Sequence, residues 1–300
     1  MTERCGYVAL IGRPNVGKST LLNHLLRQKL AITSRKPQTT RHVMLGVDTE
    51  GEKQAIYVDT PGIHDHADRE MNRIMVRSAT SVLDDVDLIV MVVEREQWTN
   101  EDELVLEHLA KAVARADNGV RAIAVINKVD QLKRKEKLLP VIERLHGLDV
   151  FDVIIPISAL KRTGLDALRE EVFSRLPEHP HLFPPDQVTD QTEKFIVSEI
   201  IREKLMRRLG DEIPHRTAVV IEHYDEGEDR VDIAADIYVE RDGQKRIIIG
   251  KGGEKLKMIG QEARKDIEAL LEQPVMLKLW IKVRPGWTNS SAALKRMGYD

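Results

Sequence analysis

The spacing of apolar residues divides the chain into two parts. As far as residue 176, short apolar runs alternate with stretches in which leucine and valine recur every three or four residues. Such runs predict strands buried on both faces, and the longer period predicts amphipathic helices. This alternation is typical of an α/β fold, a mostly parallel sheet with helices on both faces. The predicted strands are 8–11, 55–58, 88–93, 122–126 and 153–157.

A cluster of prolines interrupts this pattern, at Pro177, Pro180, Pro184 and Pro185. Proline disfavours helix in the residue before it, so we expect a linker at 177–190 between domains at 1–176 and 191–300. Beyond the linker, stripes at 196–209 and 256–270 predict helices, whereas strict alternation at 231–239 and 275–283 predicts half-buried strands. The second part is therefore predicted to be a small α+β domain with a C-terminal tail.

Composition and charge limit the classes of protein to which the chain can belong. The 300 residues carry a net charge of −3 and one cysteine, Cys5, which excludes an internal disulfide framework and fits a reducing cytoplasm. No apolar run approaches the roughly 18 residues of a membrane span, and we expect no signal peptide. The overall charge hides basic clusters after residue 200, and such local basic surfaces can bind phosphates.

The candidate chemistry begins directly after the first predicted strand. The sequence GRPNVGKS at 12–19 matches G-x-x-x-x-G-K-[ST], and strand, glycine-rich loop and helix follow in the order a phosphate-binding loop needs. Backbone N–H groups face the polyphosphate, Lys18 reaches the β- and γ-phosphates, and the Ser19 hydroxyl can ligate Mg²⁺. The predicted phosphate-binding residues are Gly12, Arg13, Pro14, Asn15, Val16, Gly17, Lys18, Ser19 and Thr20.

A second motif predicts which base the bound nucleotide carries. The sequence NKVD at 127–130 follows the predicted strand 122–126. The Asp130 carboxylate can accept hydrogen bonds from N1–H and the N2 amine of guanine, and sites of this kind reject other bases by about 10⁴ or more. Asn127 can brace the phosphate loop, and the Lys128 stem can cover the base face. Ser158, Ala159 and Leu160, after the last strand, can place an N–H against guanine O6.

Two further segments are placed to sense the γ-phosphate. Asp59, Thr60, Pro61 and Gly62 end another strand; the Asp59 carboxylate can hold Mg²⁺ through water, and the Gly62 N–H can bond the phosphate. The polar loop with Gln38, Thr39 and Thr40 can complete the Mg²⁺ shell through a hydroxyl. We favour Thr40, with Thr39 second, so the predicted Mg²⁺ ligands are Ser19, Thr40 and Asp59. A loop without a ligand is the alternative. The expected switch loops are 34–41 and 59–73.

These elements stand in the order found in translation-factor-type GTPases, and the resemblance covers the first domain. It implies GTP and GDP as ligands, Mg²⁺ and GTP hydrolysis. Many such enzymes place a water-orienting glutamine after D-x-x-G, whereas Ile63 stands there in this chain. The resemblance is then to GTPases with a hydrophobic residue at this position, in which a phosphate-loop asparagine holds K⁺. Asn15 occupies that place, and slow, K⁺-stimulated hydrolysis is the hypothesis; alternatively Asn15 only shapes the loop.

The second domain contains a candidate RNA-binding loop. An apolar run at 247–249 precedes Gly250, Lys251, Gly252 and Gly253, and an amphipathic helix follows. Apolar run, G-x-x-G and helix form the core of a KH module, here of type II, whose loop clamps the backbone of about four nucleotides. A glycine turn in a protein-binding domain is the alternative. The predicted RNA-binding residues are Ile249, Gly250, Lys251, Gly252, Gly253, Lys255 and Lys257.

A GTPase domain followed by a KH-like domain resembles the Era-like family of bacterial ribosome-assembly GTPases, of the TrmE-Era-EngA type. The resemblance runs from Gly6 to about Trp287 and includes PQTTRH, DTPG, NKVD and IIIGKGG. It implies binding near the 3′ end of 16S ribosomal RNA and action on the small (30S) subunit. It also implies a cytoplasmic protein with a peripheral pool at the inner membrane, and we expect a monomer.

Three other functions compete with this interpretation. A signalling or membrane-scaffold protein would use the nucleotide only to gate partner binding. A P-loop ATPase or kinase is disfavoured by Asp130 and by the lack of an acceptor-binding lid. A tRNA-modifying GTPase would need additional domains for which the chain lacks room. His64 and His66 we expect to be exposed loop residues, since the histidines have no zinc-like spacing.

Overall fold

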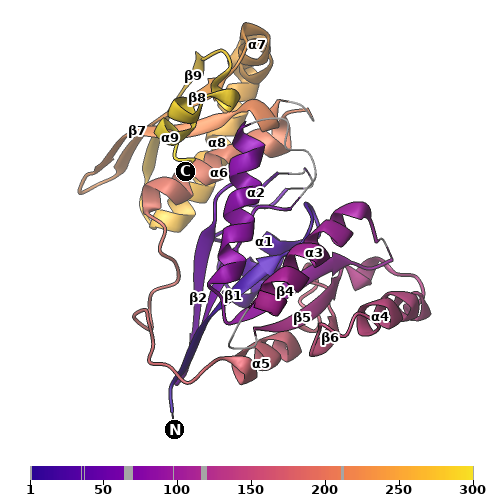
Figure 1. Ribbon diagram of the computed structural model, residues 1–300. Coiled ribbons are helices and arrows are strands. Elements are labelled where there is room, and N and C mark those ends of the chain that lie inside the picture. The colour runs from indigo at the N-terminus through magenta and orange to yellow at the C-terminus, as the bar shows by residue number, and fades with distance from the viewer. Residues whose placement is uncertain are drawn as a thin grey trace. The chain divides into compact units, whose positions relative to one another are not determined.

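The computed structural model describes residues 2–34, 36, 38–63, 70–96, 98–115, 120–210 and 213–299. It divides into two compact units (Figure 1). The first unit holds most of the chain up to Asp190, and the second holds the chain from Gln191 onward. The second unit also takes in the described residues of two earlier segments, 34–39 and 68–74.

A six-stranded sheet in the order β2-β3-β1-β4-β5-β6 forms the centre of the first unit. Strand β2 runs antiparallel to β3, and the remaining neighbours are parallel. The strands are β1 (Arg4–Ile11), β2 (Met44–Glu50), β3 (Lys53–Asp59), β4 (Leu88–Glu94), β5 (Arg121–Asn127) and β6 (Val153–Pro156). The five strands predicted from apolar runs are confirmed. The hydrophobic pattern does not predict β2, because its Gly46, Asp48 and Glu50 break the apolar run.

Helices cover both faces of this sheet. Residues of α2, α3 and α4 join the strands in one large core cluster, whereas α1 and α5 pack against β3 and against each other. Fully buried strand residues such as Leu10 and Val90 explain why the strands are apolar on both sides. The helices are α1 (Lys18–Leu25), α2 (Glu70–Ser81), α3 (Asn100–Arg115), α4 (Leu139–His146) and α5 (Leu165–Arg175).

The proline-rich segment 177–190 packs on the first unit. The Val47 N–H donates to Val188 O at 2.8 Å, and Thr189 forms a bridge with Gly46. The buried Gln54 side chain accepts from the Leu182 N–H and donates to Phe183 O. The boundary between the compact units therefore falls after this segment, at Asp190.

The second unit has the element order α-β-β-α-α-β followed by a short C-terminal helix. Its sheet is β7-β8-β9, with β7 antiparallel and β9 parallel to β8. Strand β8 alternates buried and half-buried residues as its sequence predicts, with Ile233, Ile237 and Val239 in the core. The elements are α6 (Glu193–Arg208), β7 (Ala218–Glu226), β8 (Val231–Val239), α7 (Asp242–Ile249), α8 (Glu254–Leu271), β9 (Val275–Val283) and α9 (Ser291–Arg296).

Candidate nucleotide and RNA sites

The phosphate loop connects β1 to the N-terminus of α1. Gly17 caps this helix at φ 104°, and a Cβ there would lie 2.4 Å from Asn127 Nδ2, so only glycine fits. The Lys18 ammonium is buried and donates to Gly12 O at 2.8 Å and Arg13 O at 3.2 Å. Burial lowers the pKa of Lys18 to about 8, against the attraction of Asp59. This lysine is held where an anionic phosphate would stabilise its charge.

Three oxygens from separate elements meet beside the loop. Ser19 Oγ donates to Asp59 Oδ2 at 2.8 Å and lies 2.7 Å from Thr40 Oγ1. Thr40 Oγ1 is also 3.4 Å from Asp59 Oδ2. Asp59 Oδ1 is buried with no hydrogen-bond partner among the described residues, and burial raises the pKa of this carboxyl group. Hydroxyl and carboxylate oxygens around an unsatisfied buried oxygen fit a hard cation such as Mg²⁺.

The two threonines of the polar loop point to different partners. Thr40 joins the oxygen cluster, whereas the Thr39 hydroxyl lies 2.7 Å from Ser34 Oγ and bonds Lys36 O. Gln38, at φ 56°, donates to Asn72 Oδ1 at 3.3 Å. The geometry brings Thr40 to the predicted metal ligands and leaves Thr39 in its own loop.

The D-x-x-G segment packs against the phosphate loop. The buried Thr60 hydroxyl donates to Leu10 O at 2.8 Å, and Pro61 is buried beside it. A Cβ on Gly62 would lie 2.7 Å from Pro14 N, so the two loops touch through backbone. Ile63 is fully buried in the core, so its side chain has no means of orienting water. His64, His66 and the rest of 64–69 lie outside the described residues, as do Arg35 and Pro37.

Asn127 joins three loops at the opposite end of the candidate site. Its Nδ2 donates to Val16 O at 2.8 Å, and its Oδ1 accepts from the N–H groups of Lys128 and Ala159 at 2.7 and 3.0 Å. Asp130 Oδ1 accepts from Ser158 Oγ at 2.6 Å. The phosphate loop, the N-K-x-D loop and the segment at 158–160 are thereby fixed around one space. At its rim the Leu160 side chain is 68% exposed.

Sequence reasoning missed a charged residue that belongs to these loops. Glu94, the last residue of β4, contacts both Arg13 and Lys128. Its position in the sequence, directly after the predicted strand 88–93, could have identified Glu94 as a site residue. The carboxyl ends of neighbouring parallel strands meet at one edge of a sheet, where the other site loops also begin.

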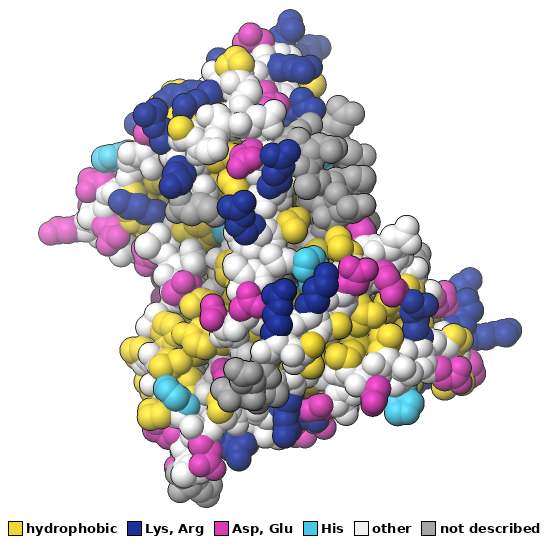
Figure 2. Space-filling view, viewed as in Figure 1, with side chains coloured by type: hydrophobic (Ala, Val, Ile, Leu, Met, Phe, Trp, Pro, Cys, Tyr) yellow, Lys and Arg dark blue, Asp and Glu magenta, His cyan; other side chains and the backbone are white. Residues whose placement is uncertain are grey.

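The candidate RNA loop connects α7 to α8 in the second unit. Gly250, Gly252 and Gly253 have φ values of 74°, 59° and 84°, which L side chains rarely adopt. Lys251 and Lys257 are exposed, whereas Ile249 and Lys255 are half-buried. Helix α8 begins directly after the loop, with Gly253 as its N-cap. Figure 2 shows Lys and Arg side chains gathered around α7 on the visible face of this unit.

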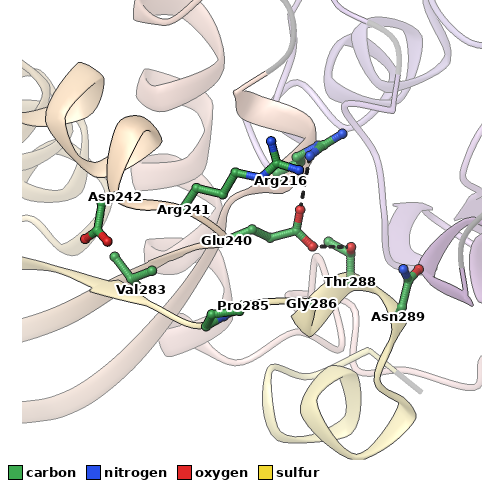
Figure 3. A pocket seen from close by; sticks show the side chains of 9 residues that line it. All are labelled: Arg216, Glu240, Arg241, Asp242, Val283, Pro285, Gly286, Thr288 and Asn289. Carbon is green, nitrogen blue, oxygen red and sulfur yellow. Dashed lines mark hydrogen bonds and ion pairs between the residues drawn. The ribbon is translucent and has the colours of Figure 1, made fainter.

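The second unit also has a pocket of about 660 Å³ at the other end of α7 (Figure 3). Within it Glu240 accepts from the Thr288 hydroxyl at 2.6 Å and pairs with Arg216 at 3.4 Å. Arg241 and Asp242 complete the charged part of its lining. None of the predicted RNA-binding residues lines this pocket, so it is separate from the G-x-x-G loop.

The fold and these loops define a P-loop GTPase joined to a KH domain. Residues 7–128 match the family described as a 50S ribosome-binding GTPase, and residues 212–288 match the KH domain family. A protein of Ectopseudomonas mendocina named GTPase Era is 53% identical over 99% of this chain and 97% of its own length. GTPase Era of Pseudomonas putida strain KT2440 is 51% identical over 99% of this chain and 96% of its own length. The chain therefore belongs to the Era family of GTPases.

Solved structures agree with this assignment. A single-residue variant of Aquifex aeolicus Era, bound to GDP and AlF₄⁻, matches with a TM-score of 0.91, 38% identity and 99% coverage of both chains. Era in complex with MgGDPNP and nucleotides 1506–1542 of 16S ribosomal RNA matches with the same score, identity and coverage. Among the described residues, no helix combines the length and the apolar character that crossing a bilayer requires.

Proposed function

We propose that this GTPase is a molecular switch that binds the 3′ region of 16S ribosomal RNA through its KH loop and acts in assembly of the small (30S) ribosomal subunit. The observation that carries this proposal is the match over 99% of both chains to an Era structure that holds MgGDPNP and 16S nucleotides. The G-x-x-G loop between α7 and α8 lies within residues 212–288, which match the KH domain family, and this supports the proposal.

Mg²⁺ is the proposed metal, with Ser19, Thr40 and Asp59 as the residues that would hold it. When bound, the ion neutralises charge on the β- and γ-phosphate oxygens. The chain contributes the Lys18 ammonium, the N–H groups at the start of α1, and the Gly62 N–H next to the phosphate loop. Asp130, with Ser158 bonded to it, would select guanine. Because Ile63 supplies no polar group to orient the attacking water, we propose slow turnover.

We propose K⁺ as a second cation, held by the Asn15 side chain. Asn15 is exposed in the phosphate loop at φ 65°, a left-handed conformation that asparagine tolerates well. This backbone also supports the alternative that Asn15 only shapes the loop. Asn15→Gly retains the conformation and removes the side chain, whereas Asn15→Ala also strains the backbone. If the Asn15 side chain holds K⁺, both variants should hydrolyse GTP at the same rate in KCl and in NaCl. Retained K⁺ stimulation in Asn15→Gly would leave only the loop-shaping role.

Coupling to RNA is proposed to run through the segment 34–39, which belongs to the second compact unit. There the Arg202 guanidinium of α6 donates to Thr39 O, and the Lys36 ammonium donates to Leu209 O. Thr40, the next residue after Thr39, is a proposed Mg²⁺ ligand. A γ-phosphate that orders Thr40 therefore restrains a loop bonded to the KH unit.

Such coupling is reciprocal, so RNA that favours the GTP state must tighten GTP binding by the same factor. Titrating a GTP analogue with and without a 16S 3′ fragment measures it. An unchanged affinity would argue against the coupling while leaving RNA binding itself intact.

RNA binding is tested at Gly252. A Cβ there meets no atom within 4 Å, and asparagine and aspartate tolerate its φ of 59° better than other side chains. Gly252→Asp should abolish crosslinking to the 16S 3′ fragment, because the carboxylate repels phosphates, and should leave basal GTPase activity unchanged. Gly252→Asn is the matched neutral control and should retain most binding. Equal crosslinking by the wild type and Gly252→Asp would refute the assignment.

From the family resemblance we also propose a monomer in the cytoplasm with a peripheral pool at the inner membrane. Cell fractionation with and without a high-salt wash tests the pool, and light scattering tests the oligomeric state. A protein absent from the membrane fraction at low salt would remove that part of the proposal.

A further inference from the structure

Glu94 connects two loops that approach different parts of the nucleotide. It ends β4 directly opposite Asn127, the last residue of β5. Its Oε2 accepts from Arg13 Nη2 of the phosphate loop at 3.0 Å and pairs with Lys128 Nζ of the N-K-x-D loop at 3.2 Å. The Arg13 and Glu94 side chains are only 11% and 12% exposed, so water screens the pair weakly.

A second carboxylate fixes the other side of Arg13. Its Nε donates to Asp102 Oδ2 at 3.1 Å, and the Asp102 side chain is fully buried. Asp102 also accepts from the Thr99 N–H and hydroxyl at 2.9 Å, at the start of α3. The guanidinium is thus held between the ends of β4 and α3, with its donors directed at carboxylates. These two ion pairs anchor the phosphate loop to the ends of β4 and α3.

We propose that Glu94 is a positioning residue that couples the guanine-reading loop to the phosphate loop. One carboxylate oxygen restrains the ammonium of Lys128, whose stem covers the base, and the guanidinium of Arg13, which anchors the phosphate loop. A bound base that orders Lys128 also orders Glu94 and, through Arg13, the loop that receives the phosphates. The inference rests on the proposed placement of Lys128 over guanine.

The test compares ligands that occupy both loops or only one. Glu94→Gln removes the charge and retains the size of the side chain. We expect GDP affinity to fall by about tenfold, within the usual range of coupling between sites, and pyrophosphate affinity to fall by less. In a Lys128→Met background, which retains an apolar stem, the additional loss of GDP affinity from Glu94→Gln should shrink to the loss seen with pyrophosphate. KM for GTP should rise with little change in kcat.

Asp48→Asn is the matched control for a merely structural effect. Asp48 is another shielded carboxylate of the first unit, bonded by Arg169 Nε at 2.6 Å and Nη2 at 2.8 Å. Its loss should lower thermal stability and leave GDP affinity unchanged. The proposal is overturned by equal losses for GDP and pyrophosphate, by additive effects in the double variant, or by the same loss of affinity in Asp48→Asn. Failure of the underlying base assignment would appear separately, as an Asp130→Asn variant that does not shift its preference from GTP to XTP.

Discussion

Replacing Asn127 by alanine tests whether one side chain holds the nucleotide loops together. The change removes three hydrogen bonds and leaves Val16 O and the Ala159 N–H buried without a partner, since these residues are 0% and 1% exposed. At about 1–3 kcal/mol for each unpaired group, the total cost is about 3 kcal/mol. We expect the nucleotide-free protein to relieve about half of this free-energy cost, because its loops can separate and admit water to the unpaired groups.

A bound nucleotide requires the loops to come together again, so the other half appears in binding. About 1.5 kcal/mol corresponds to GDP affinity about tenfold weaker. Urea unfolding of the free protein and calorimetric titration with GDP measure the two parts. Asn23→Ala is the matched control, because Asn23 also makes three hydrogen bonds, to Leu30 and Ala31. It should lose similar stability and keep its GDP affinity within about twofold. Equal GDP affinities in the two variants would refute the reasoning.

Three further predictions concern the phosphate end of the site. Thr40→Ala should weaken Mg²⁺-dependent binding of a GTP analogue by about tenfold, whereas Thr39→Ala should not, because only Thr40 joins Ser19 and Asp59; equal effects in titrations at several Mg²⁺ concentrations would contradict this. The pKa of Lys18, about 8 in the free protein, should rise when phosphate binds, so GDP affinity is full below pH 8 and declines above it. Calorimetry at pH 8 in buffers of different ionisation enthalpy should then detect proton uptake, and its absence would be inconsistent with a lowered pKa. Gly62→Ala should reduce turnover about tenfold or more, because its Cβ would displace Pro14 of the phosphate loop; wild-type turnover in a phosphate-release assay would show that the loops need not touch.

Local pattern was sufficient to predict most of the elements in this chain. The five apolar runs and the two alternating segments all form strands. They could be predicted because the spacing of apolar residues, every second residue in a strand and every three or four in a helix, depends only on which residues face the core. The glycines of the G-x-x-G loop adopt the positive φ values that their residue type allows. Strands β2 and β7 and helices α7 and α9 were not predicted, because mixed polar residues or short length leave no clear period. The same reasoning could not show that 177–190 packs on the first unit.

The sequence by itself determined which motifs are present and in which order: GRPNVGKS, DTPG, NKVD and IIIGKGG. The tertiary structure decided which side chains meet. Thr40 reaches Asp59 because β2 pairs antiparallel with β3, which sets Met44 opposite Asp59. Glu94 reaches Lys128 because β4 and β5 are neighbours and end together. Which side chains meet in this way depends on the order and direction of the strands in the sheet. These are long-range properties, and the spacing of apolar residues within one segment does not reveal them.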